Sequence, residues 1–428
     1  MTTTQTLRGA AARLATAAVL LAAGAVGAAA AEDPADHPGG YWPGLHGPRR
    51  DNMSTETGLL VRWPDGGPPR LWTFTECGRG YACPAIVNGR LFTSGDFDRD
   101  EYVLALDLDG NLLWKTQNGK AWRGAEPGAR TTPTWSDGMV YHLGPHGRLA
   151  ALRADTGEEV WAVDLVEAFG ARRSTWGFAE NVRVVDDVVL CVPGGTRGRV
   201  VALDKKTGRP VWVNTTVGDD QAYCSPAVVT HEGRRQLIIL MKKSVVGVDL
   251  ATGRRLWSHP HPSRYNQNVD TPLYHDGRVF VTSGHQAGGR LIDIGPDGST
   301  VRQVWHCREF DNCHGGVLLL DGYLYGVGCR MYHKGLLCVD WETGEVAYRH
   351  EPVGKVSLTW AEGFIYGVGQ KGEVRLVKAD PKGATIVSEF QIPPVATKDH
   401  LLAHPGVCGG RLYIRHADHL LAYDIRKR

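Results

Sequence analysis

Short apolar segments recur along the chain, and each is followed by residues that favour tight turns. In the copy that runs from Pro84 to Trp114, apolar segments flank Asn88-Gly89, and two further segments flank Asp109-Gly110. Segments of this length joined by Asn-Gly or Asp-Gly are typical of antiparallel strands connected by hairpins. The pattern therefore predicts an all-β chain assembled from four-stranded antiparallel units.

Each unit ends in an aromatic residue, and these residues recur every 42 to 51 positions. They are Trp72, Trp114, Trp161, Trp212, Trp257, Trp305, Tyr348 and Phe390. A repeat of this length with four strands is typical of a propeller blade.

The ends of the chain set the number of blades. Seven copies are complete, whereas the last, from Pro405 to Asp424, has only three strands. We expect residues 70–73 to supply its missing outer strand, because that pairing closes the ring and removes two exposed sheet edges. The prediction is an eight-bladed β-propeller over residues 70–428.

The N-terminus has the features of a signal peptide. Arg8 and Arg13 precede an apolar stretch, and Ala29-Ala30-Ala31 offers small residues for cleavage. A membrane anchor is the alternative, because the stretch is about long enough to span a bilayer. We interpret residues 1–31 as a signal peptide and residues 32–69 as an N-terminal extension. This predicts a periplasmic or extracellular protein whose mature chain has no transmembrane segment.

Charge and cysteine content narrow the class further. The chain has 48 basic and 46 acidic residues, and removal of residues 1–31 leaves 46 of each. A neutral mature chain gives no electrostatic case for nucleic-acid binding. Nine cysteines in an exported chain indicate disulfides. Cys77/Cys83 and Cys307/Cys313 are pairs close in sequence, and Cys329/Cys338 could face each other across a hairpin, although the sequence does not fix the connectivity.

The repeat resembles that of a known family. The run Ala-Leu-Asp-Lys-Lys-Thr-Gly-Arg-Pro-Val-Trp at 202–212 is similar to the tryptophan-docking repeat of pyrroloquinoline-quinone-like propellers. The resemblance extends from about Trp42 to Asp424 and concerns the fold more than the activity. Two kinds of relative frame the function: quinone-dependent alcohol dehydrogenases and the propeller lipoprotein of the outer-membrane β-barrel assembly machinery.

The dehydrogenases bind pyrroloquinoline quinone with calcium on the propeller axis and use an aspartate as base. Their best-known members carry adjacent cysteines beside the cofactor, and this chain has no adjacent cysteines. The lipoprotein carries a lipidation cysteine, which this chain lacks before Cys77. The resemblance therefore carries over no set of functional residues.

The long loops of the repeat are expected to gather on one face of the ring, where binding residues collect on propeller scaffolds. Residues just before each innermost strand should rim a central funnel. They are Tyr81, Arg130, Trp176, Tyr223, Asp270, His314, Lys355 and His404. Such a rim suits a small polar ligand, a planar quinone or a metal, and a solvated funnel without a ligand is the alternative.

Individual rim residues suggest specific chemistry. Asp270 is the candidate catalytic base or calcium ligand, with Asn268 offering another oxygen, and a loop-capping role is the alternative for Asp270. Trp176 lies off the repeat position and could stack on a ligand, together with Tyr223, or contact a partner. Arg130 and Lys355 are candidate cofactor-binding cations. His314 and His404 are candidate metal ligands, although ordinary loop polarity explains histidines there equally well.

Three functions remain open. The first is an exported, monomeric scaffold that binds a protein, a polysaccharide or a small molecule at its funnel face. The second is a quinoprotein-type oxidoreductase that uses pyrroloquinoline quinone and calcium to oxidise an alcohol or sugar. The third is a scaffold in outer-membrane assembly. Addition of the quinone and calcium to purified protein separates the second function from the others.

Overall fold

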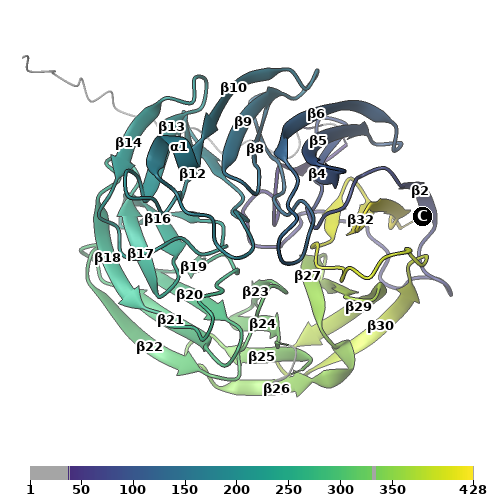
Figure 1. The fold of residues 1–428 in the computed structure, drawn as a ribbon. Coiled ribbons are helices and arrows are strands. Elements are labelled where there is room, and N and C mark those ends of the chain that lie inside the picture. Colours follow the sequence, from purple (N-terminus) through teal and green to yellow (C-terminus); the bar gives the residue numbers. More distant parts are fainter. Residues whose placement is uncertain (1–36, 38, 330–333, 428) are drawn as a thin grey trace, which may run out of the picture. The chain divides into compact units, whose positions relative to one another are not determined.

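The computed structural model describes His37, residues 39–329 and residues 334–427, and these form eight antiparallel sheets arranged as the blades of a ring (Figure 1). The predicted all-β, eight-bladed propeller is confirmed. The predicted signal peptide, residues 1–31, lies outside the described residues. Within the described ranges, no helix has the length and apolar character that crossing a membrane requires.

Each blade has four strands, ordered from the ring axis outward, and the sheet of blade 1 gains a fifth strand from the N-terminal extension. Blades 1 to 4 contain β3 (Ala85–Val87), β4 (Arg90–Phe97), β5 (Asp100–Asp107) and β6 (Leu112–Lys120); β7 (Thr134–Ser136), β8 (Met139–Leu143), β9 (Arg148–Arg153) and β10 (Glu159–Asp164); β11 (Arg183–Val185), β12 (Val188–Cys191), β13 (Val200–Asp204) and β14 (Pro210–Asn214); and β15 (Ala227–His231), β16 (Arg234–Leu240), β17 (Ser244–Asp249) and β18 (Arg255–Pro260).

The second half of the ring repeats this order. Blades 5 to 8 contain β19 (Leu273–His275), β20 (Arg278–Ser283), β21 (Gly288–Ile294) and β22 (Val301–Cys307); β23 (Val317–Leu320), β24 (Tyr323–Val327), β25 (Leu336–Asp340) and β26 (Val346–His350); β27 (Val356–Ala361), β28 (Phe364–Gly369), β29 (Glu373–Asp380) and β30 (Gly383–Gln391); and β31 (Gly406–Cys408), β32 (Arg411–His416), β33 (His419–Asp424) and β2 (Arg70–Phe74). A helix α1 (Leu165–Phe169) and a 3-10 turn (Glu351–Val353) lie in crossings between blades.

The ring closes as the sequence predicted. Strand β2 pairs antiparallel with β33, with Thr73 opposite Leu421 and Phe74 opposite Leu420. The N-terminal strand β2 thus completes the last blade and covers the outer edge of β33.

The turns between the first and second strands are uniformly tight. Both central residues have positive φ in most of them, as at Asn88-Gly89 (53° and 73°) and Asp321-Gly322 (48° and 80°). This combination defines the type I′ hairpin, whose twist matches that of the flanking strands. We call the side of the ring that carries these turns the tight-turn face and the opposite side the long-loop face.

The closing tryptophans hold neighbouring blades together. The indole Nε1 of Trp161 donates to the Lys205 carbonyl oxygen at 2.9 Å, and Trp72, Trp114, Trp212 and Trp305 make equivalent bonds to the next blade. Each of these indoles covers a glycine of the neighbouring outer turn; for Trp161 it is Gly208. The buried apolar clusters likewise combine residues of two adjacent blades, so the core is a series of interblade layers.

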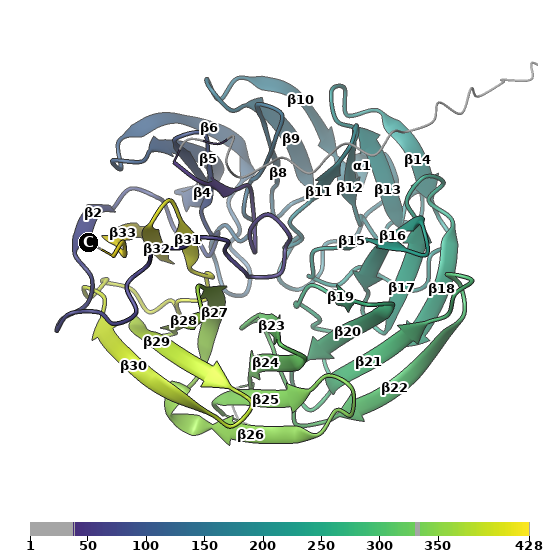
Figure 2. The same ribbon diagram turned by 180° about the vertical axis from the view of Figure 1, so that it is seen from behind.

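The N-terminal extension does more than lead into β2. Strand β1 (Tyr41–Trp42) pairs with β3 on the inner edge of blade 1. The following segment reaches blade 7, where the backbone N–H of Trp360 donates to the backbone carbonyl oxygen of Asn52 at 2.8 Å. Glu362, in a tight turn, accepts hydrogen bonds from the Gly58 and Leu59 amides. Figure 2 shows this purple segment crossing the middle of the ring, so the extension covers the central channel on the tight-turn face.

One disulfide is present among the described residues. Cys313, in the crossing to blade 6, bonds Cys329 after β24, with Cα atoms 5.5 Å apart. Cys329 therefore does not pair with Cys338, which lies opposite Tyr325 and is a buried free thiol. The connection joins two loops rather than two strands, which is why strand spacing did not indicate it.

Candidate functional site

A cavity of about 210 Å³ lies in the central channel, which we call the funnel cavity. Its walls come from the crossings that precede the innermost strands, and therefore from the long-loop face. Seven of the eight predicted rim residues line it: Tyr81, Arg130, Trp176, Tyr223, Asp270, His314 and His404. The register of the repeat thus brings residues from seven blades to one space.

The N-terminal extension forms the floor of this cavity. Leu45 and His46 line its inner end, and the His46 ring meets the His404 ring edge-to-face with centroids 4.5 Å apart. Burial lowers the pKa of both imidazoles. The nearby His404 lowers the pKa of His46 further. The floor is therefore made of neutral rings, and the funnel is a pocket rather than an open channel.

Three buried polar atoms that lack hydrogen-bond partners belong to residues lining the cavity: the Tyr81 hydroxyl oxygen, Arg130 Nε and Asp270 Oδ2. Buried polar groups in native proteins are almost always paired with protein or water. These three residues therefore have hydrogen-bonding capacity that their protein neighbours do not use.

Asp270 carries the most perturbed carboxyl group of the lining. Burial raises the pKa of Asp270 to about 7, against smaller opposing effects of the Gly316 amide and the Lys355 charge. Near neutral pH the group is therefore partly protonated and can donate as well as accept a hydrogen bond. Lys355 does not itself line the cavity.

Aromatic side chains form one wall. Trp176 and Tyr223 pack edge-to-face with ring centroids 5.5 Å apart. Arg130 fixes this wall, because its Nη1 donates to the Trp176 carbonyl oxygen at 2.8 Å and its Nη2 donates to the Glu126 carbonyl oxygen at 2.5 Å. The guanidinium thus positions the aromatic residue while its Nε stays unpaired.

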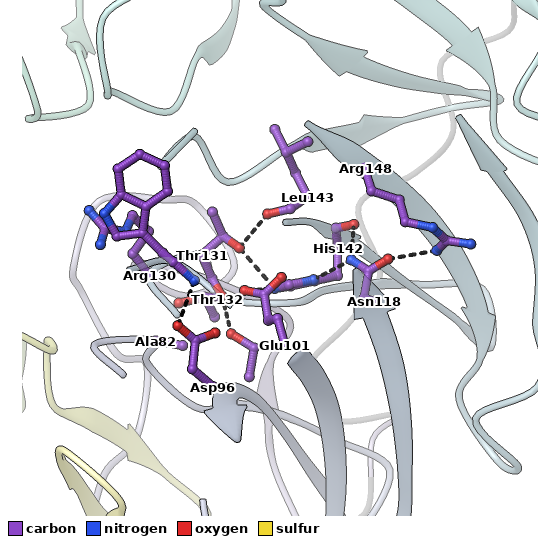
Figure 3. A network of polar contacts seen from close by, with 12 residues as sticks. Ala82, Asp96, Glu101, Asn118, Arg130, Thr131, Thr132, His142, Leu143 and Arg148 are labelled. Carbon is purple, nitrogen blue, oxygen red and sulfur yellow. Dashed lines mark hydrogen bonds and ion pairs between the residues drawn. The ribbon is translucent and has the colours of Figure 1, made fainter. Parts of the chain in front are cut away.

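A buried network behind Arg130 supports the same wall (Figure 3). Thr131 donates to the Leu143 carbonyl oxygen at 2.6 Å, so its hydroxyl accepts from His142 Nε2 at 2.8 Å. His142 Nδ1 then accepts from the Asn118 amide at 2.8 Å. These bonds specify one neutral tautomer of His142 and hold the crossing that carries Arg130.

Glu101 lies 3.9 Å from His142 Nε2, but the two groups are not an ion pair. Burial raises the pKa of Glu101 well above its usual range and lowers the pKa of His142 to about 4. Both shifts favour the neutral forms, so burial opposes an ion pair between the two groups.

Asn268, the predicted companion of Asp270, does not line the cavity. Its amide donates to the Met241 and Lys242 carbonyl oxygens at 2.6 and 3.1 Å, and its Oδ1 accepts from Ser283 at 2.6 Å. Asn268 is completely buried, and these bonds occupy both ends of its amide. The prediction placed it correctly in the crossing but on the wrong side of it.

Of the two histidines proposed as metal ligands, His404 has both ring nitrogens close to backbone carbonyl oxygens. His404 Nδ1 and Nε2 lie 3.3 and 3.2 Å from the carbonyl oxygens of Leu358 and His314. In the described part of the chain, the one group of three metal-type donors is His285, Cys313 and Cys329. Its cysteines are joined in the disulfide. The geometry therefore brings no third donor to His314 and His404.

The floor residue His46 was not foreseen from the sequence. Its φ of 65° and the φ of 78° at Gly47 show a turn, which the run Gly-Leu-His-Gly-Pro at 44–48 suits. That signal predicts a turn but not the blade that the turn meets, because the partner residues lie far along the chain.

Comparison with known proteins supports the fold and the repeat. A family model described as "Outer membrane protein assembly factor BamB" matches residues 99–350, more than half of the chain. Subunit 1 of methanol dehydrogenase [cytochrome c] from Methylorubrum extorquens is 31% identical over 169 residues. That match covers 35% of this chain and 26% of the subunit, so the chain spans about a quarter of this relative.

Two solved structures share the fold at low identity. BamB from Moraxella catarrhalis is 16% identical with a TM-score of 0.58, and the match covers 83% of this chain and 99% of BamB. A europium-containing methanol dehydrogenase is 12% identical with a TM-score of 0.63, covering 85% of this chain and 87% of the enzyme. Propellers with an assembly role and propellers with a dehydrogenase role are thus both similar to this chain in architecture.

Proposed function

This chain belongs to the PQQ-like β-propeller family, and on that premise we propose that it is an exported binding protein that holds a small polar molecule in its funnel cavity. The observation that carries the proposal is the convergence of Trp176, Tyr223, Arg130 and Asp270, from four crossings, on one cavity.

The walls suggest the kind of molecule. The Trp176 and Tyr223 rings offer apolar surface for a flat group, whereas Arg130, Tyr81 and Asp270 offer polar contacts at several points. The volume of about 210 Å³ is below the roughly 300–1,000 Å³ typical of sites for drug-sized ligands. A compact molecule with one planar face fits these features best.

The cavity is a poor match for the calcium and quinone of the related dehydrogenases. Calcium takes about six to eight oxygen ligands, yet no three acidic or histidine donors converge among the described residues of this cavity. Asn268 is turned away from the cavity, and its amide donates to the Met241 carbonyl oxygen. These observations favour binding without oxidation.

Ligand-observed NMR on the purified protein tests the proposal. The panel contains monosaccharides, small aromatic acids and amides, and pyrroloquinoline quinone with calcium. We expect saturable binding of at least one compound and its loss in Trp176→Ala. The matched control is Tyr265→Ala, which removes an exposed aromatic ring from the crossing before blade 5, outside the cavity.

Two results would count against this function. One is the absence of binding across the panel, which leaves a solvated funnel. The other is dye-linked alcohol oxidation after addition of the quinone and calcium, which restores the oxidoreductase alternative. Binding that persists unchanged in Trp176→Ala would move the ligand to another surface.

A further inference from the structure

A second cavity, of about 260 Å³, lies between the N-terminal extension and the inner strands of blades 4 to 6. Its lining includes Arg49, Arg50 and Arg183 together with apolar residues of β15, β19 and β23. We call it the arginine cavity. It shares His46 and Asp270 with the funnel cavity but lies toward the opposite, tight-turn face of the channel.

Arg50 and Arg183 are the unusual groups in this lining. Burial lowers the pKa of both guanidinium groups, that of Arg50 to about 9, and the charge of Arg183 adds to the effect on Arg50. Arg50 donates from Nη2 to the Thr134 hydroxyl at 3.0 Å and to the Val182 carbonyl oxygen at 3.3 Å. It therefore joins the extension to blades 2 and 3 without meeting an acidic group.

Arg183 has fewer contacts still. Its Nε is buried without a hydrogen-bond partner, and no carboxylate of the described residues lies within ion-pair distance of its guanidinium. Arg235, whose charge also lowers the pKa of Arg183, is itself bonded to Asp186 at 2.5 Å. Arg183 is thus a half-buried cation that lines the cavity and has no carboxylate partner among the described residues.

The acidic groups of the lining do not neutralise this pair. Asp51 bonds Arg49 Nε at 2.8 Å and the Met53 amide at 3.0 Å. Asp270 lies at the end shared with the funnel cavity, where it accepts a bond from the Gly316 amide. The two half-buried guanidinium groups therefore lack a carboxylate counter-ion, and the charge of Arg183 acts unfavourably on that of Arg50.

We propose that the arginine cavity binds a small oxyanion, held by Arg183 and Arg50. The forked donors of a guanidinium match the oxygens of a phosphate or a carboxylate. The volume exceeds that of several water molecules, each of about 30 Å³, so it accommodates an ion of this size. Bound there, the anion links the N-terminal extension to blade 3 and stabilises the floor of the funnel.

Titration calorimetry of the whole exported chain tests this site. Inorganic phosphate, acetate and succinate are added separately to protein in Bis-Tris propane chloride, so the phosphate and carboxylate sources are distinguished. We expect one saturable site for at least one of these ions. Arg183→Gln should weaken its binding by at least tenfold, because a charge-assisted pair of bonds is lost.

Arg209→Gln is the matched control, because it removes the same charge from an exposed turn of the same blade. Arg209→Gln should bind the anion with the affinity of the unaltered protein. Its unfolding temperature should also rise as much as that of the unaltered protein when the anion is added. In anion-poor buffer, Arg183→Gln should unfold at a temperature no lower than Arg209→Gln does, because it removes a buried charge without a counter-ion.

Should Arg183→Gln fail to fold, Arg183→Lys replaces it in the same titration, since lysine keeps the charge but loses the fork. A reduced affinity in that variant supports the site. The proposal is overturned if none of the three ions binds saturably up to tens of millimolar. It is also overturned if the Arg183 variants bind with unchanged affinity, because general salt effects on stability do not depend on one arginine.

Discussion

At the scale of single residues, Asp270 controls a pH dependence that the fold imposes. Burial raises its pKa to about 7, whereas the unfolded chain has a value near 4. Between these values the unfolded state releases a proton that the folded state keeps, so stability falls as pH rises through this window. Asp270→Asn mimics the protonated form. We expect its free energy of unfolding, relative to the unaltered protein, to increase by about 2 kcal/mol between pH 5 and pH 8.

Urea unfolding at both pH values measures this difference. Other buried carboxyl groups with raised pKa values, such as Glu180 (about 8), are present in both proteins and cancel in the comparison. Asp109→Asn, in an exposed outer turn, provides the control. Its free energy of unfolding should differ from that of the unaltered protein by the same amount at the two pH values. Parallel pH profiles for Asp270→Asn and the unaltered protein would show that Asp270 is ionised in the folded state.

At the scale of the blade, the packing of indole rings on outer-turn glycines predicts how much stability is lost when such a glycine is replaced. Gly208 has a φ of 70°, and a Cβ atom added there would lie 2.6 Å from the Trp161 ring. Gly233 has a φ of 73° with nothing within 4 Å of an added Cβ. Gly233→Ala should therefore cost only the left-handed backbone strain, about 1–2 kcal/mol.

Gly208→Ala should cost at least about 1 kcal/mol more, because the indole must also move from its packed position. Chemical denaturation of the two variants, followed by far-UV circular dichroism, gives both free energies. Equal costs would mean that the indole adjusts freely and that the contact between blades 2 and 3 does not depend on a bare glycine.

These elements also show what the sequence could predict. The strands of the blades and the closing role of residues 70–73 follow from a periodic signal that every copy repeats. The same register placed Tyr81 and Asp270 on the funnel, because each precedes an innermost strand. Asn268 lies in an irregular crossing, where no alternation rule specifies which way a side chain points. Strand β1 has two residues, too few for a pattern.

At the scale of the whole molecule, the chain before blade 1 has two structural roles. Strand β2 completes blade 8, and the segment before it closes the channel through contacts with blades 1 and 7. Leu59 and Trp63 of the extension also belong to the apolar cluster between blades 7 and 8. The extension and β2 therefore connect the beginning of the ring to its end, so the propeller should unfold as one unit.

Two truncated proteins test this unity. A protein of residues 37–428 should elute as a monomer and unfold in one transition. A protein of residues 75–428 exposes the edge of β33, an unpaired strand that favours association. We expect it to unfold at a lower temperature and to form oligomers in size-exclusion chromatography. Residues 37–74 contain both the extension and β2, so their co-expression should restore the monomer. A 75–428 protein that stayed monomeric with an unchanged unfolding temperature would show that blade 8 holds without its outer strand.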